Sequence, residues 1–137
     1  MLTVSGQIQK TNVGDTAQFD LAMLDALGRI EFETNTIWTD GPVTFTGVPL
    51  SALLDTLGVT SGTLKATAVN DYIIEIPVAD VEPDAPIIAH HMNGEQMARR
   101  DKGPLWIVYP YDRDEKYQTE VTYSRSIWQL DRIEAVK

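Results

Sequence analysis

The sequence predicts one α+β domain with a mixed β-sheet and short helices, spanning residues 1–137. Short segments of alternating or apolar β-type residues outnumber the helical ones, and they do not alternate with helices as in a doubly wound fold. Gly, Pro, Asn and Asp separate these segments at short intervals. No internal repeat, low-complexity segment or linker divides the chain. A chain of 137 residues can bury roughly two thirds of its unfolded surface in one core.

Three elements are expected before residue 40. Asp20 is a suitable N-cap for a short helix, and Gly28 is expected to close that helix in a left-handed conformation. The elements are a strand over residues 2–8, a helix over residues 20–27 and a half-buried strand over residues 30–38, with a polar loop at residues 11–16.

A second helix, over residues 50–57, has the clearest pattern. Its apolar residues recur at spacings of three and four, which places them on one face, and Gly58 ends the helix. These residues are Leu50, Leu53, Leu54 and Leu57. A short strand over residues 43–48 precedes it.

Beyond residue 60 the chain is rich in β-structure. Asn70-Asp71 and Asn93-Gly94 indicate two hairpins, and Arg99 to Lys102 form an exposed charge run. Strands are expected over residues 64–69, 72–76, 87–92, 105–109 and 133–136. We expect the side chains of Leu53, Leu54, Leu57, Ile74, Ile76, Trp106 and Ile107 to be buried.

Charge and composition exclude several classes of function. Eleven Lys and Arg against 20 Asp and Glu give a net charge of -9, which repels nucleic-acid phosphates, so no nucleic-acid partner is expected. No apolar run approaches eighteen residues, so no membrane insertion is expected. The chain contains no Cys, which removes disulfides, thiolate metal sites and cysteine nucleophiles.

The two histidines, His90 and His91, are the first candidates for chemistry. Neighbours on a regular strand point to opposite faces, so the pair is not expected to chelate one metal ion. His90 is expected to face inward, either packed and hydrogen-bonded or in contact with a ligand, and His91 to face solvent.

Charged side chains offer further candidates, because the sequence motifs of nucleotide-binding loops, serine hydrolases and zinc peptidases are absent. Arg125 either accepts an anion or pairs with Glu120 or Asp131. The acidic loop of Asp80, Glu82 and Asp84 lacks the glycine and bidentate glutamate of a calcium loop, which favours a solvated loop over a cation site.

Five motifs in a fixed order carry a family resemblance. They are WTDGPVTFTGVPLSALLDTLGV at residues 38–59, NDYIIEIPVAD at 70–80, PIIAHHMNGEQM at 86–97, GPLWIVYP at 103–110 and SIWQLDRIEAV at 126–136. In this order they resemble the molybdopterin-binding domain of the sulfite oxidase family, over roughly residues 30 to 136. The small single-domain bacterial members look most similar.

The resemblance implies a mixed α+β fold that holds a molybdenum-pterin cofactor, with a cysteine in the strand before the GVPL segment as a metal ligand. Here that stretch, residues 33–38, has no cysteine. The lysines of the family's KSxKW pattern, aligned on Trp128, fall on Ser124 and Ile127, so that only a displaced Arg125 carries charge. The family's catalytic role is therefore not carried over, and no residue is predicted to be catalytic or to ligate a metal.

Two functions are compatible with these departures. The favoured one is a non-catalytic domain of the molybdopterin-binding fold, with no cofactor expected, that binds a small polar or anionic ligand or a partner protein. The alternative is a molybdopterin-dependent oxidoreductase, or a subunit of one, without cysteine ligation of molybdenum. Whether the protein is an enzyme stays open, although the missing cysteine favours that it is not.

The resemblance also implies a place for the site. The residual cleft is expected to be lined by Thr34, Thr36, Trp38, Tyr72, His90 and Arg125. In the other interpretation His90 and Tyr72 fill the vacated cleft and leave no pocket. Because small bacterial relatives are commonly exported, the resemblance implies a periplasmic or secreted protein; without a leader, the protein would be cytoplasmic.

Overall fold

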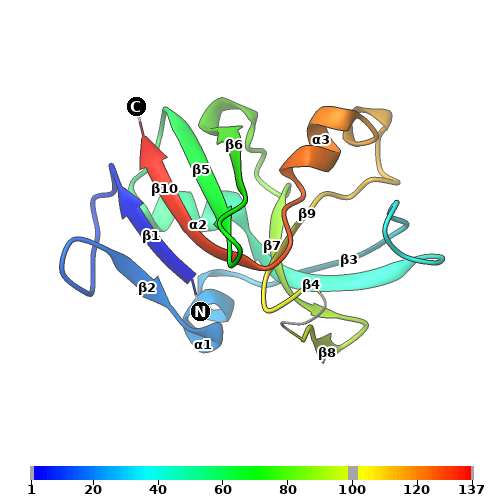
Figure 1. The fold of residues 1–137 in the computed structure, drawn as a ribbon. Coiled ribbons are helices and arrows are strands. Elements are labelled where there is room, and N and C mark those ends of the chain that lie inside the picture. The colour runs from blue at the N-terminus through cyan, green and yellow to red at the C-terminus, as the bar shows by residue number, and fades with distance from the viewer. Residues whose placement is uncertain (1, 99–101, 137) are drawn as a thin grey trace.

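Two β-sheets packed with three short α-helices form the fold (Figure 1). The computed structural model describes residues 2–98 and 102–136. Of the predicted charge run, only Lys102 lies within the described residues.

The first sheet has the strand order β2-β1-β10-β5-β6. Its strands are β1 (Leu2–Gly6), β2 (Ala17–Phe19), β5 (Thr63–Ala68), β6 (Ile73–Pro77) and β10 (Leu130–Val136). The strand β10, red in Figure 1, lies between β1, to which it runs parallel, and β5, to which it runs antiparallel. This sheet is therefore mixed, as predicted.

The second sheet is antiparallel and is organised around β7. It contains β3 (Ile30–Thr34), β4 (Val43–Pro49), β7 (Ile87–Met92), β8 (Glu95–Gln96) and β9 (Trp106–Val108). One edge of β7 pairs with β4, and the other pairs with β9 and β8. The α+β class is confirmed, whereas the sequence did not predict that the strands divide between two sheets.

The helices are α1 (Leu21–Leu27), α2 (Leu50–Leu57) and α3 (Glu120–Arg125), and short 3-10 turns lie at Val78–Asp80 and Glu115–Tyr117. The boundaries of α2 are those predicted, and Gly58 closes it in the left-handed conformation at φ 73°. Asp20 caps α1 by accepting a hydrogen bond from the backbone N–H of Met23. The prediction that Gly28 closes α1 in the left-handed conformation is wrong. Its φ of 150° and ψ of 152° describe an extended backbone that glycine tolerates best.

Several strand boundaries differ from the prediction. The strand predicted over residues 30–38 ends at Thr34, because the Thr36 hydroxyl accepts the backbone N–H of Trp38 and turns the chain. The first strand ends at Gly6 instead of residue 8, and β10 begins at Leu130 instead of residue 133. Both predicted hairpins are present, as β5–β6 and β7–β8.

The core lies between the sheets and beneath α1 and α2. All seven side chains predicted to be buried are buried, and Trp106 at the centre has no exposed surface. Burial of this apolar surface is the main driving force of folding, since each large apolar side chain contributes roughly 1.5 to 3 kcal/mol. Among the described residues, no helix has the length and apolar character needed to cross a membrane.

Candidate functional site

A pocket of about 350 Å³ opens between the β5–β6 hairpin and the segment that follows Tyr123. Aromatic rings and neutral polar groups line it, and every lining side chain is uncharged. The lining residues are Trp38, Ala68, Asn70, Tyr72, Tyr123, Ser124, Ser126, Ile127, Trp128 and Gln129. These come from three parts of the chain, residue 38, residues 68–72 and residues 123–129, that only the folded state brings together.

The ring of Trp38 lies at the centre of an aromatic cluster and contacts four other rings. It meets the rings of Trp106 and Trp128 edge-to-face, with centroids 5.7 and 5.6 Å away. Tyr111 and Tyr123 contact it in the same way at 6.0 and 5.9 Å. Such contacts favour a fixed ring orientation over a mobile one. Trp38 is therefore a preformed surface and not a side chain that must be ordered on binding.

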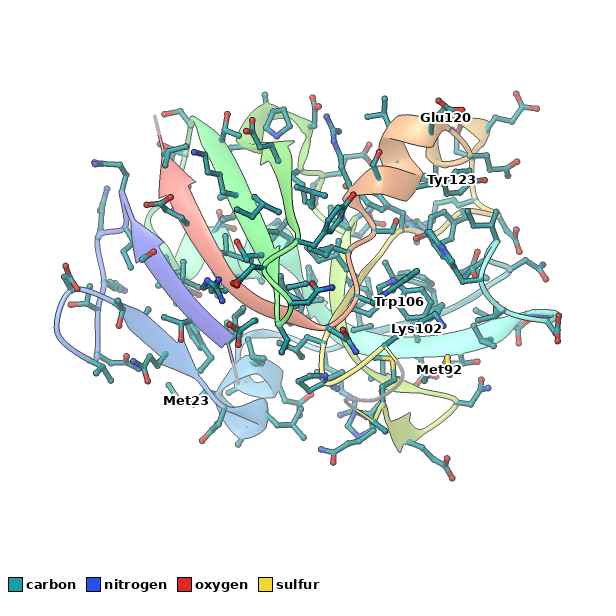
Figure 2. The ribbon with its side chains drawn as sticks, in the orientation of Figure 1. Met23, Met92, Lys102, Trp106, Glu120 and Tyr123 are labelled. Carbon is teal, nitrogen blue, oxygen red and sulfur yellow. The ribbon has the colours of Figure 1, made fainter. Side chains whose placement is uncertain are left out.

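Lys102 covers the outer side of this cluster. Its ammonium group lies 5.6 Å from the ring centroid of Trp106 and 5.2 Å from that of Trp128. Figure 2 shows Lys102 beside Trp106, with Tyr123 above them on α3. The positive charge is held against ring faces through cation–π contact, and Lys102 is not among the pocket residues.

Ser126 anchors the wall of the pocket. Its hydroxyl accepts a hydrogen bond from the Tyr111 hydroxyl at 2.6 Å and donates one to the Thr122 carbonyl at 2.9 Å. Its own carbonyl accepts the indole N–H of Trp106 at 3.2 Å. Burial raises the pKa of Tyr111 far above its ordinary value and that of Tyr109 to about 12, so both phenols stay neutral donors at physiological pH.

Three ion pairs join the acidic loop to residues 113–125. Asp84 pairs with Arg113 at 2.6 Å, Glu82 with Lys116 at 2.8 Å, and Asp80 with Arg125 at 3.1 Å. Hydrogen bonds from Lys116 and from the Tyr117 hydroxyl lower the pKa of Glu82. The acidic loop is thus joined by ion pairs to the segment that precedes the pocket wall. The partners predicted for Arg125, Glu120 and Asp131, are wrong because the fold brings Asp80 to its guanidinium instead.

Two of the predicted site residues, Trp38 and Tyr72, line this pocket. Thr34 is buried, donates to the Asn35 carbonyl and accepts the backbone N–H of Asp112, so it links two loops. Thr36 acts indirectly, by fixing the turn that presents Trp38. Because Tyr72 is 57% exposed and a pocket is present, the interpretation in which Tyr72 fills the cleft does not apply.

Arg125 and His90 are placed elsewhere. Arg125 lies between the lining residues Ser124 and Ser126, but its guanidinium is bound to Asp80. His90 is on β7 near α1 and is not a lining residue. That any of these six residues contacts a ligand stays a prediction.

His90 and His91 do not point to opposite faces as predicted. The register of β4 and β7 shifts at this point: Thr46 pairs with His91 and Gly47 with Ala89, so His90 is the extra residue of a β-bulge. Gly47 permits the close approach, because a β-carbon there would overlap the carbonyl oxygen of Ile88. As a result the Nδ1 atoms of the two rings lie 2.6 Å apart.

The surroundings of His90 disfavour its protonated form. Burial lowers the pKa of His90, and the neighbouring His91 and Arg29 lower it further, while Asp25 raises it. The Nε2 atom lies 3.6 Å from a carboxylate oxygen of Asp25 and makes no hydrogen bond.

Comparison with known proteins assigns the fold. The family model described as the oxidoreductase molybdopterin binding domain matches residues 16–113. The crystal structure of the sulfane dehydrogenase SoxCD from Paracoccus pantotrophus has the same fold, with a TM-score of 0.70 at 19% identity. The similarity covers 98% of this chain but only 37% of that one. No curated protein matches the chain.

Proposed function

Because the chain belongs to the oxidoreductase molybdopterin binding domain family, we propose that it uses the cleft of this fold to bind a small polar organic molecule with a planar ring, without redox catalysis. The observation that carries the proposal is the uncharged lining of the pocket, to which two tryptophans and two tyrosines contribute aromatic rings. Aromatic faces stack against planar rings, and a few polar groups at their edge select the ligand's orientation.

The residues of the cleft do not fit a molybdenum-pterin. The chain has no thiolate, and the stretch aligned with the family's cysteine offers Thr34, Asn35 and Thr36, whose oxygen donors are harder ligands. Among the described residues, no three His, Cys, Asp or Glu side chains lie close enough together to hold a metal ion. An anionic, phosphorylated cofactor would also meet an uncharged wall in a chain of net charge -9.

The polar groups at the rim suit a neutral ligand. The Tyr72 and Tyr123 hydroxyls make no hydrogen bond with any described residue, so both can donate to a bound molecule. Asn70 accepts the backbone N–H of Tyr72 with its side-chain oxygen Oδ1. That contact fixes the side-chain amide of a residue that lines the same pocket as Trp38 and Trp128.

An anionic ligand is less well supported than a neutral one. Arg125 would have to leave Asp80 to reach the pocket, and its side chain is only 22% exposed. Removing it from Asp80 would uncover the Asp80 charge beside the incoming anion. The proposed ligand is therefore neutral.

Tryptophan fluorescence can test this proposal, because Trp38 and Trp128 lie in the pocket wall. Indole, adenine and free pterin serve as neutral planar probes, and benzoate serves as the anionic one. We expect at least one neutral probe to quench the signal saturably, and Tyr72→Ala to weaken its binding at least about tenfold, the equivalent of about 1.4 kcal/mol. The matched control is Ile73→Ala: Ile73 is exposed to the same degree, 55% against 57%, and lies outside the lining.

Equal losses in Tyr72→Ala and Ile73→Ala would place the binding site elsewhere. Saturable binding of benzoate alone, abolished by Arg125→Gln, would replace the neutral ligand with an anion. Metal analysis of protein expressed with molybdate tests the other half of the proposal. Stoichiometric molybdenum with a pterin chromophore would overturn it in favour of a molybdopterin-dependent oxidoreductase.

A further inference from the structure

The β-bulge at His90 places two imidazole nitrogens side by side. The Nδ1 atoms of His90 and His91 are 2.6 Å apart, and the two rings are inclined by 85°. Two nitrogens that bind one metal at right angles, each at about 2.0 to 2.1 Å, lie about 2.9 Å apart. The separation is therefore within about 0.3 Å of the one that a chelated metal requires, and on binding both rings turn so that their lone pairs point to the metal instead of along the line between the two nitrogens.

Asp25 selects the tautomer that such binding requires. His90 Nε2 is buried, lacks a hydrogen bond, and faces the Asp25 carboxylate oxygen at 3.6 Å. A proton on Nε2 meets this negative charge favourably, whereas a lone pair there would be repelled by it. With the proton on Nε2, the lone pair of His90 is on Nδ1, toward His91. A carboxylate behind a ligating imidazole is the usual outer partner in metal sites.

We propose that His90 and His91 bind one divalent transition metal ion through their Nδ1 atoms, with Asp25 as the positioning residue behind His90. Copper(II) should bind most tightly, since neutral imidazole nitrogens suit its tetragonal geometry and it stands highest in the affinity order of divalent ions. Water completes the coordination on the side of His91, which is half-buried. In the metal-free state the Nδ1–H of His91 donates to His90, and on binding this proton moves to Nε2 of His91.

The site is separate from the aromatic pocket. His90, His91 and Asp25 are all outside its lining, so metal binding neither requires nor excludes the proposed ligand. It also supplies only two protein ligands, because the described residues contain no group of three or more metal-binding side chains. The site is thus open, and weaker than the closed four-ligand sites that hold structural zinc.

Copper(II) titration of the tag-free chain is the direct test. We expect one ion per chain by calorimetry, and a pulsed electron paramagnetic resonance spectrum with modulation from two imidazoles. Because His90 and His91 are the only histidines in the chain, that signal has a single source. Absence of saturable binding, or modulation from one imidazole only, would overturn the proposal.

Variants distinguish a metal site from a structural His pair. We expect His91→Gln to lower copper affinity at least about tenfold, and Asp25→Asn to lower it about 10- to 100-fold, with folding checked by circular dichroism. Arg29 binds the same Asp25 oxygen at 3.1 Å and adds positive charge near the site, so Arg29→Gln should raise the affinity. If Asp25→Asn and Arg29→Gln both weaken binding equally, Asp25 acts only on the local fold. Unchanged affinity in His91→Gln would show that copper binds elsewhere.

Discussion

The aromatic pocket and the histidine pair are built in different ways. Three separate parts of the chain form the pocket, and its wall depends mainly on buried aromatic contacts and on the Ser126 hydrogen bonds, with the Arg125–Asp80 ion pair beside it. The histidine pair depends on one extra residue in a single strand and on one carboxylate of α1. The first site therefore depends on many contacts of the buried aromatic cluster, and the second depends on a few positions: the bulge in β7, Gly47 opposite it and Asp25.

This difference predicts where the two sites fail. A change that loosens the packing of residues 111–126, which lie outside the sheet that contains β7, should damage the pocket before it affects the metal-binding pair. A change in the bulge opposite Gly47 should do the reverse.

Trp106→Ala should have the largest effect. Trp106 is fully buried, contacts Trp38, Phe45 and Trp128, and donates its indole N–H to the Ser126 carbonyl. Truncating a buried aromatic side chain of this size costs about 3 to 5 kcal/mol. Urea unfolding measures the loss, and Trp128→Ala is the control, because Trp128 belongs to the same cluster but is 37% exposed. If both variants lose equal stability, the cluster is not organised around Trp106.

Raising the pH into the alkaline range should have the second-largest effect on stability, through Tyr109. Burial raises the pKa of Tyr109 to about 12 from an unperturbed value of 10.0. The unfolded chain therefore releases this proton first, and the stability that is fully present below pH 10 is lost progressively as the pH rises toward about 12. The loss should reach about 2 to 3 kcal/mol.

Urea unfolding across this range, followed together with tyrosinate absorbance, checks that prediction. In Tyr109→Phe the alkaline decline should be smaller. A decline of the same size in the variant would mean that other groups dominate the alkaline loss.

Tyr111→Phe should cost about 1 kcal/mol, the typical net value of one hydrogen bond. The change removes the buried 2.6 Å contact to the Ser126 hydroxyl, which keeps its own hydrogen bond to the Thr122 carbonyl. Tyr72→Phe serves as the control, since the exposed Tyr72 hydroxyl has no partner among the described residues. Thermal unfolding followed by circular dichroism compares the two variants, and equal changes would argue against a role for Ser126 in holding the wall.

The sequence predicted those parts of the fold whose signals are local. The leucine spacing of α2, the hairpin at Asn93-Gly94 and the whole of β7 are confirmed. The six-residue α3 was missed, because a helix this short shows no apolar period. Thr119, which caps it by accepting the backbone N–H of Thr122, was an available signal.

The sites were harder to predict than the fold because their geometry is not local. Trp38 and Tyr72 were found through the family resemblance, whereas Tyr123 lies on the missed helix. The partner of Arg125 depends on the tertiary approach of the acidic loop, and nothing in the residues around His90 indicates an extra residue in the strand. The periplasmic or secreted location stays a prediction, which an upstream leader sequence would support.

The ion pairs should contribute least to the pocket wall. Asp84 and Arg113 are both about half exposed, so water and salt screen their attraction, and a pair of this kind is worth less than about 1 kcal/mol. A double-mutant cycle with Asp84→Asn and Arg113→Gln, measured by urea unfolding at low and high salt, gives the coupling energy directly. We expect a small value that vanishes at high salt, with affinity for a neutral probe unchanged in all three variants. A larger coupling, accompanied by loss of the probe, would mean that charge and not aromatic packing holds the wall, and the contrast between the two sites would then have to be redrawn.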